Sequence, residues 1–201
     1  MKIGVITPAC NEQDHILDCI KSVWAQDIDC HVVHYIFDDA STDNTANLVK
    51  GLLPDDNIVL LSSSPNAGVS WGRNQLITAA IAEGCDYIAF LDADDVWLPQ
   101  HLSAALNEIG DNDIAYTKPS HRFEDGTPCE RSNIPVPKTF IGKHLMHNNF
   151  IYTPCVVAKA ECFKTNRFDC ALDGLEDWDM WYRLWEQGYK FVAVDRRTMI
   201  H

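Results

Sequence analysis

The residues whose types and spacing are best suited to chemistry lie in the segment Leu91-Asp92-Ala93-Asp94-Asp95, which follows an apolar run that begins at Tyr87. An Asp-x-Asp spacing in an extended chain places both carboxylates on one side, where they can offer oxygen ligands to Mg²⁺ or Mn²⁺ and leave positions for a diphosphate. The alternative is that Asp94 or Asp95 caps a helix that begins near Pro99. The position directly after a buried strand favours the metal hypothesis, because the spacing alone is common.

Further polar segments follow other predicted strands, at 7–12, 38–39 and 64–66. In an open α/β sheet the ligand lies beyond the carboxyl ends of the strands, so these segments are expected to meet at one edge. Acidic groups gathered there cost free energy unless a cation or hydrogen-bond donors offset them. The pattern therefore predicts a ligand site at this edge.

Alternating strand and helix patterns define the expected fold. Strands are expected at 2–7, 31–37, 58–61, 87–91, 113–117, 152–159 and 190–194, and helices near 16–24, 48–53, 69–84, 99–109, 141–147 and 176–187. Apolar strands without alternation are typical of a parallel sheet that is covered by helices on both faces. The prediction is one α/β domain, Rossmann-like and doubly wound, with a mostly parallel sheet and a glycine- and proline-containing excursion at 122–137.

Charge and cysteine content exclude several classes of protein. Sixteen Lys and Arg against 29 Asp and Glu give a net charge of −13, which disfavours nucleic acid and anionic membrane surfaces as partners. An anionic ligand would then need a cation in its site. The eight cysteines lack zinc-knuckle spacing, and the sequence shows neither a signal stretch nor a transmembrane segment, so a cytoplasmic protein with free thiols is expected.

Five motifs in order give the chain a family resemblance from Lys2 to about Val194. They are the segments 6–12 (ITPACNE), 38–43 (DDASTD), 66–74 (NAGVSWGRN), 91–95 (LDADD) and 176–179 (EDWD). Together they resemble the family-two glycosyltransferases, which have the A-type nucleotide-sugar fold. The resemblance implies a domain spanning 1–201, with a nucleotide-sugar-binding half at 1–98 and an acceptor-binding and catalytic-base half at 99–201.

The resemblance also implies a donor site. It assigns the nucleotide sugar to seven residues: Thr7, Pro8, Glu12, Asp39, Arg73, Asp92 and Ala93. Asp39 would accept a hydrogen bond from N3 of a uracil-like base, and Arg73 would close over the base or the diphosphate. Each position also has an ordinary structural interpretation, such as a strand stop, a helix cap or an ion-paired helix residue.

By the same resemblance, Asp92 and Asp94 would hold Mn²⁺ or Mg²⁺, and His201 after the last strand would reach the metal or the diphosphate. The metal would neutralise the diphosphate that leaves as the sugar is transferred. Asp95 could instead bind ribose, bind sugar hydroxyls or cap the next helix.

Asp177 is the general base that the resemblance implies, acting in a single displacement that inverts the anomeric centre. Asp179 is the competing candidate, but two residues along a helix are separated by ~200° around its axis, so the two carboxylates cannot both face the sugar. Three tryptophans at helical spacing, Trp178, Trp181 and Trp185, are interpreted as core. Trp71 and Trp97 lie near the site segments and are expected to touch sugar or base.

The predicted function is metal-dependent, inverting transfer of a sugar from a UDP-linked donor to a saccharide or glycolipid-precursor hydroxyl. One alternative is a catalytically weak nucleotide-sugar or carbohydrate-binding module. The other is a sugar-phosphate nucleotidyltransferase, which would need a glycine-rich, basic loop after the first strand, where residues 7–12 have neither glycine nor a cation.

Overall fold

Short apolar runs buried on both faces build the first half of the sheet. The strands β1 (Lys2–Ala9), β2 (His31–Asp39), β3 (Ile58–Ser63) and β4 (Tyr87–Phe90) pair in parallel, with β1 between β2 and β4. The computed structural model describes residues 1–53, 56–120 and 141–201. In that part of the chain Ile88, Ala89 and Phe90 have no exposed surface, as a strand covered on both faces requires.

The second half of the chain extends the same sheet, whose full order is β3-β2-β1-β4-β7-β6-β8-β5. Strand β7 (Val156–Lys159) is antiparallel to both β4 and β6 (Ile114–Ser120), and β6 runs parallel to β8 (Phe191–Ile200). The two-residue strand β5 (Val96–Trp97) pairs with the far end of β8. The α/β class and the mostly parallel sheet are therefore confirmed.

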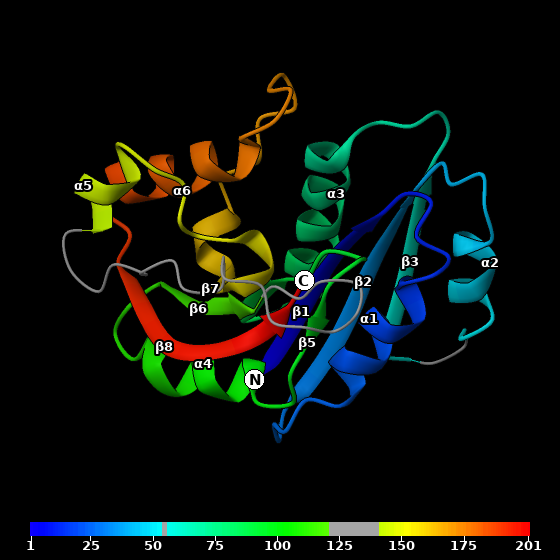
Figure 1. The fold of residues 1–201 in the computed structure, drawn as a ribbon, viewed down its shortest axis with the longest axis horizontal. Helices are drawn as coiled ribbons and strands as arrows, with labels where there is room; N and C mark the ends of the chain where they lie inside the picture. Colours follow the sequence, from blue (N-terminus) through cyan, green and yellow to red (C-terminus); the bar gives the residue numbers. More distant parts are fainter. Residues whose placement is uncertain (54–55, 121–140) are drawn as a thin grey trace.

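Helices cover both faces of the sheet (Figure 1). On one face lie α3 (Val69–Ala82), α6 (Glu176–Glu186) and the short α5 (Ile141–Leu145), whose apolar side chains share a core with Phe37 and Phe90. On the other face lie α1 (Ile16–Trp24), α2 (Thr45–Lys50) and α4 (His101–Ile109). The carboxyl ends of β1, β2 and β4 are left open between these two layers.

Two expected strands differ from the structure by four or more residues at one end. The strand predicted at 152–159 begins at Val156, because Thr153–Cys155 forms a 3-10 helix (η2) with Pro154 in its first turn. A second 3-10 helix, η3 (Ala160–Phe163), follows β7. The strand predicted at 190–194 continues to Ile200, where β5 and β6 both supply pairing partners. The excursion predicted at 122–137 lies outside the described residues.

The tryptophans divide between core and surface. Trp97 was expected to touch sugar or base, and this is wrong: it is buried, its ring stacks on His101 at 4.1 Å, and its Nε1 donates to the Pro154 carbonyl at 2.8 Å. Trp181 is fully buried, and Trp178 and Trp185 pack against the same core, as predicted. Trp71 remains partly exposed beside Phe37.

The described cysteines are free thiols, and the described helices are short. Seven of the eight cysteines fall within the described ranges, and each is a free thiol. Within those same ranges, none of the helices combines the length and apolar character needed to cross a membrane. Packing of the three apolar clusters, rather than cross-linking, holds this part of the fold together.

Candidate active site

The loops that follow β1 and β2 are bonded to each other at the open edge of the sheet. The Asn11 backbone N–H donates to Ser41 Oγ at 2.9 Å, and Asn11 Oδ1 accepts from the Thr42 N–H at 2.8 Å. The Glu12 N–H donates to Thr45 Oγ1 at 2.8 Å. These bonds fix one wall of the candidate site.

Asp39, the predicted base-binding residue, organises the turn before α3. Its carboxylate accepts from Ser63 Oγ (2.6 Å), from the Ala67 N–H (2.7 Å) and from the Gly68 N–H (2.8 Å). The neighbouring Asp38 is equally buried, but its Oδ1 has no hydrogen-bond partner among the described residues. A buried, unpaired carboxylate oxygen is costly unless a ligand donor meets it. Asp38 therefore joins Asp39 as a candidate for contact with the nucleoside.

The other predicted donor-site residues at the end of β1 and in the loop after it differ in exposure. Thr7 is fully buried and its hydroxyl lies 2.8 Å from Nε2 of His34, whose pKa burial lowers to about 3. Its side chain therefore supports the strand end, and contact with a nucleoside stays a prediction. Pro8 and Glu12 are partly exposed at the same edge. Burial, followed by the charge of Asp94, raises the pKa of Glu12, which places that carboxylate near the acidic segment.

Arg73 bridges the acidic segment and the start of α6. Its Nη2 donates to Asp92 Oδ1 and its Nη1 to Glu176 Oε1, both at 2.8 Å, and its guanidinium lies over the Phe168 ring. Burial disfavours its charge, but Asp92 and Glu176 outweigh that effect and raise the pKa of Arg73. With 5% of the side chain exposed, Arg73 is an ion-paired internal residue in this structure, and its contact with the base or diphosphate stays a prediction.

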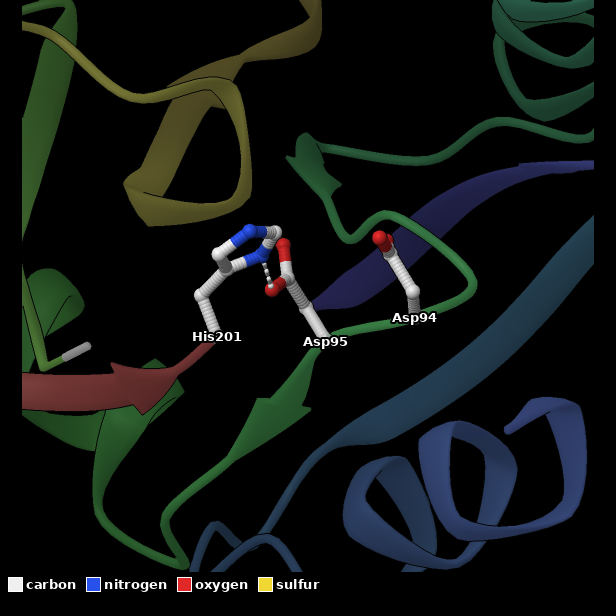
Figure 2. Close-up of side chains that lie close together, drawn as sticks. All are labelled: Asp94, Asp95 and His201. Carbon is white, nitrogen blue, oxygen red and sulfur yellow. Dashed lines mark hydrogen bonds and ion pairs between the residues drawn. The ribbon is translucent and has the colours of Figure 1, made fainter. Parts of the chain in front are cut away.

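Three side chains gather where a divalent cation could bind. One ligand atom from each of Asp94, Asp95 and His201 lies within 4.8 Å of the others, and His201 Nδ1 is 2.7 Å from Asp95 Oδ1 (Figure 2). Two carboxylates and an imidazole suit Mn²⁺, which accepts oxygen and nitrogen ligands, better than Mg²⁺, which prefers oxygen alone. The residues present thus fit the predicted cation.

The structure brings together two of the three predicted metal ligands. Asp94 and His201 lie in the cluster with Asp95, whereas Asp92 Oδ1 is bonded to Arg73, so a metal role for Asp92 stays a prediction. Ala93, expected beside the donor, is buried against α1 and α2 residues. The spacing in the sequence placed Asp92 and Asp94 on one side of the segment, and the long-range bond from Arg73 to Asp92 had no signal there.

Electrostatics make the cluster a site for positive charge. Burial, together with the charges of Asp92 and Asp94, raises the pKa of Asp95 to about 6 against the opposing effect of His201. The bond to Asp95 raises the pKa of His201 to about 9. The pair therefore retains a proton, which a bound cation would displace.

Strand pairing delivers His201 to this cluster. Ile200 pairs with Val96 on β5 and with Ser120 on β6, and the His201 N–H donates to the Ser120 carbonyl at 3.0 Å. His201 is thus held at the end of a paired strand, immediately beside the segment that carries Asp95.

The predicted base stands at the start of α6. Asp177 Oδ2 accepts from Asn149 Nδ2 at 3.0 Å and from Thr153 Oγ1 at 3.3 Å, while its Oδ1 accepts from the Trp178 N–H at 2.7 Å. Asp179 pairs instead with Arg183 and lines an apolar cavity with Trp178. The two acids face different neighbours, as the helix geometry predicts, and the sequence carried no local signal for Asn149 or Thr153.

Backbone strain is concentrated in the same loops. Within the described ranges, the non-glycine residues with positive φ are Asn11 (59°), Ala40 (57°) and Leu175 (61°). They follow β1, follow β2 and precede α6. Such conformations cost free energy and are often found at functional sites.

Comparisons with known proteins agree with this geometry. The family model described as glycosyl transferase family 2 matches residues 4–164. TuaG of Bacillus subtilis, whose name assigns it to teichuronic acid biosynthesis, is 27% identical over 96% of this chain and 75% of its own. ExoW of Rhizobium meliloti, a succinoglycan biosynthesis protein, is 27% identical over 85% of this chain and 59% of its own.

Solved structures share the fold. The S. aureus TarS fragment 1-349 in complex with UDP superposes with a TM-score of 0.80 at 22% identity, covering all of this chain and 60% of that one. The Pyrobaculum calidifontis mannosyltransferase PcManGT, in complex with GDP-Man and Mn²⁺, gives 0.76 at 17% identity, covering 99% and 56%. The chain thus spans 60% and 56% of these two solved chains. The predicted resemblance and enzyme class are confirmed, and the chain belongs to glycosyl transferase family 2.

Proposed function

We propose that this chain transfers a sugar from a UDP-linked donor to a hydroxyl of a saccharide or glycolipid-precursor acceptor, with inversion and with a divalent cation. The observation that carries the proposal is that the segment with Asp94 and Asp95, which lie beside His201, is bonded to the start of α6, where Asp177 stands. Arg73 ties the two parts together through Asp92 and Glu176.

In the proposed reaction Asp177 accepts the proton of the acceptor hydroxyl as that O–H bond breaks. The oxygen then forms a bond to the anomeric carbon, and the bond from that carbon to the diphosphate oxygen breaks, with its electron pair leaving on the diphosphate. A cation held by Asp94, Asp95 and His201 would supply charge neutralisation for the leaving group. No covalent sugar intermediate is needed, so one base suffices.

The uridine assignment rests on the paired acids at the end of β2. Asp38 has an unpaired oxygen, and Asp39 Oδ2 accepts one bond, so either carboxylate could receive a donor such as uracil N3–H. TarS structures contain UDP or UDP-GlcNAc, whereas PcManGT holds GDP-Man. Thermal stabilisation by UDP that exceeds stabilisation by GDP and ADP supports uridine, and a preference for GDP overturns it.

Calorimetry and product release test the whole proposal. UDP should bind with Mn²⁺ and bind much more weakly with EDTA. UDP release from a panel of UDP-sugars, with saccharide acceptors, should fall by roughly 10²–10⁴-fold in Asp177→Asn, which is nearly isosteric but cannot act as the base. Asp179→Asn is the matched control and should lose far less. Metal-independent binding of UDP, or unaltered transfer by Asp177→Asn, would refute the corresponding part.

A further inference from the structure

Two side chains that lie outside the predicted site hold the carboxylate of Asp177. We propose that Asn149 and Thr153 are positioning residues for this base, and that they direct the acceptor's proton to its Oδ1 atom. The inference rests on the proposed function, in which Asp177 is the base.

The hydrogen bonds distinguish the two carboxylate oxygens. An ionised carboxylate has about four lone-pair sites, two on each oxygen. Asn149 Nδ2 at 3.0 Å and Thr153 Oγ1 at 3.3 Å occupy both sites on Asp177 Oδ2. The Trp178 N–H at 2.7 Å occupies one site on Oδ1. One lone pair on Oδ1 is left to receive a proton.

The two donors are themselves fixed by the fold. Thr153 is buried in η2, and the next residue, Pro154, accepts the indole N–H of Trp97. Trp97 belongs to β5, two residues after Asp95, so the turn that carries Thr153 is bonded to the segment that carries the candidate metal ligand. Asn149 is exposed, but the two residues that follow it, Phe150 and Ile151, are buried and anchor its backbone.

These contacts have two consequences for a base. Donors to the ionised form stabilise that form, which is the one that can accept a proton. They also restrict the carboxylate to one orientation, and a displacement of about 1 Å from a productive geometry can cost roughly 10²-fold in rate. A purely structural role, in which the bonds only fasten the start of α6, would affect folding and every substrate-dependent step alike.

The first test needs no substrate. In protein labelled with ¹³C at aspartate carboxyls, the signal absent from Asp177→Asn identifies the base, and its chemical shift at neutral pH is compared in Asn149→Ala and Thr153→Val. Each change should move this signal, since a hydrogen bond to the carboxylate is removed. Asn148→Ala, at the neighbouring exposed position, and Thr153→Ser, which keeps the hydroxyl, should leave it in place. An unchanged signal in Asn149→Ala and Thr153→Val overturns the proposal.

The second test uses UDP release from UDP-GlcNAc with Mn²⁺, measured with and without saccharide acceptors. Asn149→Ala and Thr153→Val should lower kcat about 10–100-fold and leave UDP affinity within about twofold of wild type. Thr153→Ser should restore the rate. In an Asp177→Asn background, neither substitution should cause a further loss, because both act through that carboxylate.

The outcomes separate this inference from the function on which it rests. If Asp177→Asn is inactive while Asn149→Ala and Thr153→Val keep the wild-type kcat, only the positioning roles are refuted. If Asp177→Asn transfers sugar at the wild-type rate, the base assignment itself is wrong. Equal losses from Thr153→Val with and without the Asp177 carboxylate would show a structural role and overturn the proposal.

Discussion

Replacing Arg73 by Met should destabilise the protein through two carboxylates that lose their cation. Met has a similar length and fills the same space without charge or donors. The Arg73 side chain is 5% exposed, and its partners Asp92 and Glu176 are 30% and 15% exposed, each at 2.8 Å. Arg73→Met would therefore leave two largely buried acids facing one cavity with no positive charge between them.

The expected loss follows from this burial. Removing one partner of a buried ion pair typically costs about 3–5 kcal/mol of unfolding free energy. Because Asp92 is partly exposed, water screens its charge, and we expect about 2–4 kcal/mol. Lys21→Met is the matched control: its pair with Asp18 is 2.9 Å long, but the two side chains are 64% and 68% exposed, so its loss should stay below about 0.5 kcal/mol.

Urea unfolding followed by tryptophan fluorescence measures both variants. Adding Asp92→Asn and Glu176→Gln to Arg73→Met removes the uncompensated charges and should recover more than half of the loss. The reasoning is refuted if Arg73→Met loses less than about 1 kcal/mol. It is also refuted if the neutral triple variant is no more stable than Arg73→Met alone.

Three other perturbations test groups outside the Arg73 ion pairs. Burial lowers the pKa of His101 to about 3, so between pH 6.5 and 3 the unfolded chain binds a proton that the folded chain does not. From this group, the free energy of unfolding should decrease by ~1.4 kcal/mol for each unit by which the pH is lowered in that range. His101→Phe should remove that part of the slope in urea titrations, and an identical slope would contradict it. His201→Ala and Asp95→Asn should weaken UDP binding in the presence of Mn²⁺ at least about tenfold, measured by calorimetry, and leave UDP binding in EDTA unchanged. Equal weakening in EDTA would argue against a metal role for these residues. Leu175→Gly should relieve the strain of the positive φ at an exposed site and raise the free energy of unfolding by up to about 1 kcal/mol. The control Leu172→Gly, at a position without positive φ, should not raise it. A less stable Leu175→Gly variant would show that the strain is not stored there.

Local pattern was enough to predict the first half of the fold. Apolar runs such as Ile88-Ala89-Phe90 identify strands buried on both faces, and polar segments after them identify the open edge of the sheet. The sequence did not predict the end of β8, because Asp195, Arg196 and Arg197 interrupt its apolar pattern. Pairing with β5 and β6 keeps that stretch extended, and tertiary pairing of this kind has no local signature.

The candidate site shows the same limit. The acids after β4 were predicted from their types and position, but the sequence did not show that Asp92 is bonded to Arg73 while Asp94 and Asp95 lie beside His201. Arg73 also reaches Glu176, 103 residues further along the chain. Asn149 and Thr153 contact Asp177 across 28 and 24 residues of sequence, so no helical or strand period marks them.

The ion triad of Arg73, Asp92 and Glu176 allows effects on activity to be measured apart from effects on stability. A buried ion triad often contributes little net stability relative to uncharged side chains of similar volume, because desolvation offsets its attraction. The triad nevertheless joins the Asp92 segment to the first residue of α6, and Asp177 is the second, so it fixes the distance between candidate metal ligands and base. The neutral triple variant should therefore fold with near-normal stability but release UDP from UDP-sugars at least about tenfold more slowly, because the base is less precisely placed. A wild-type rate in a well-folded triple variant would show that packing alone sets this distance and that the ion triad has no positioning role.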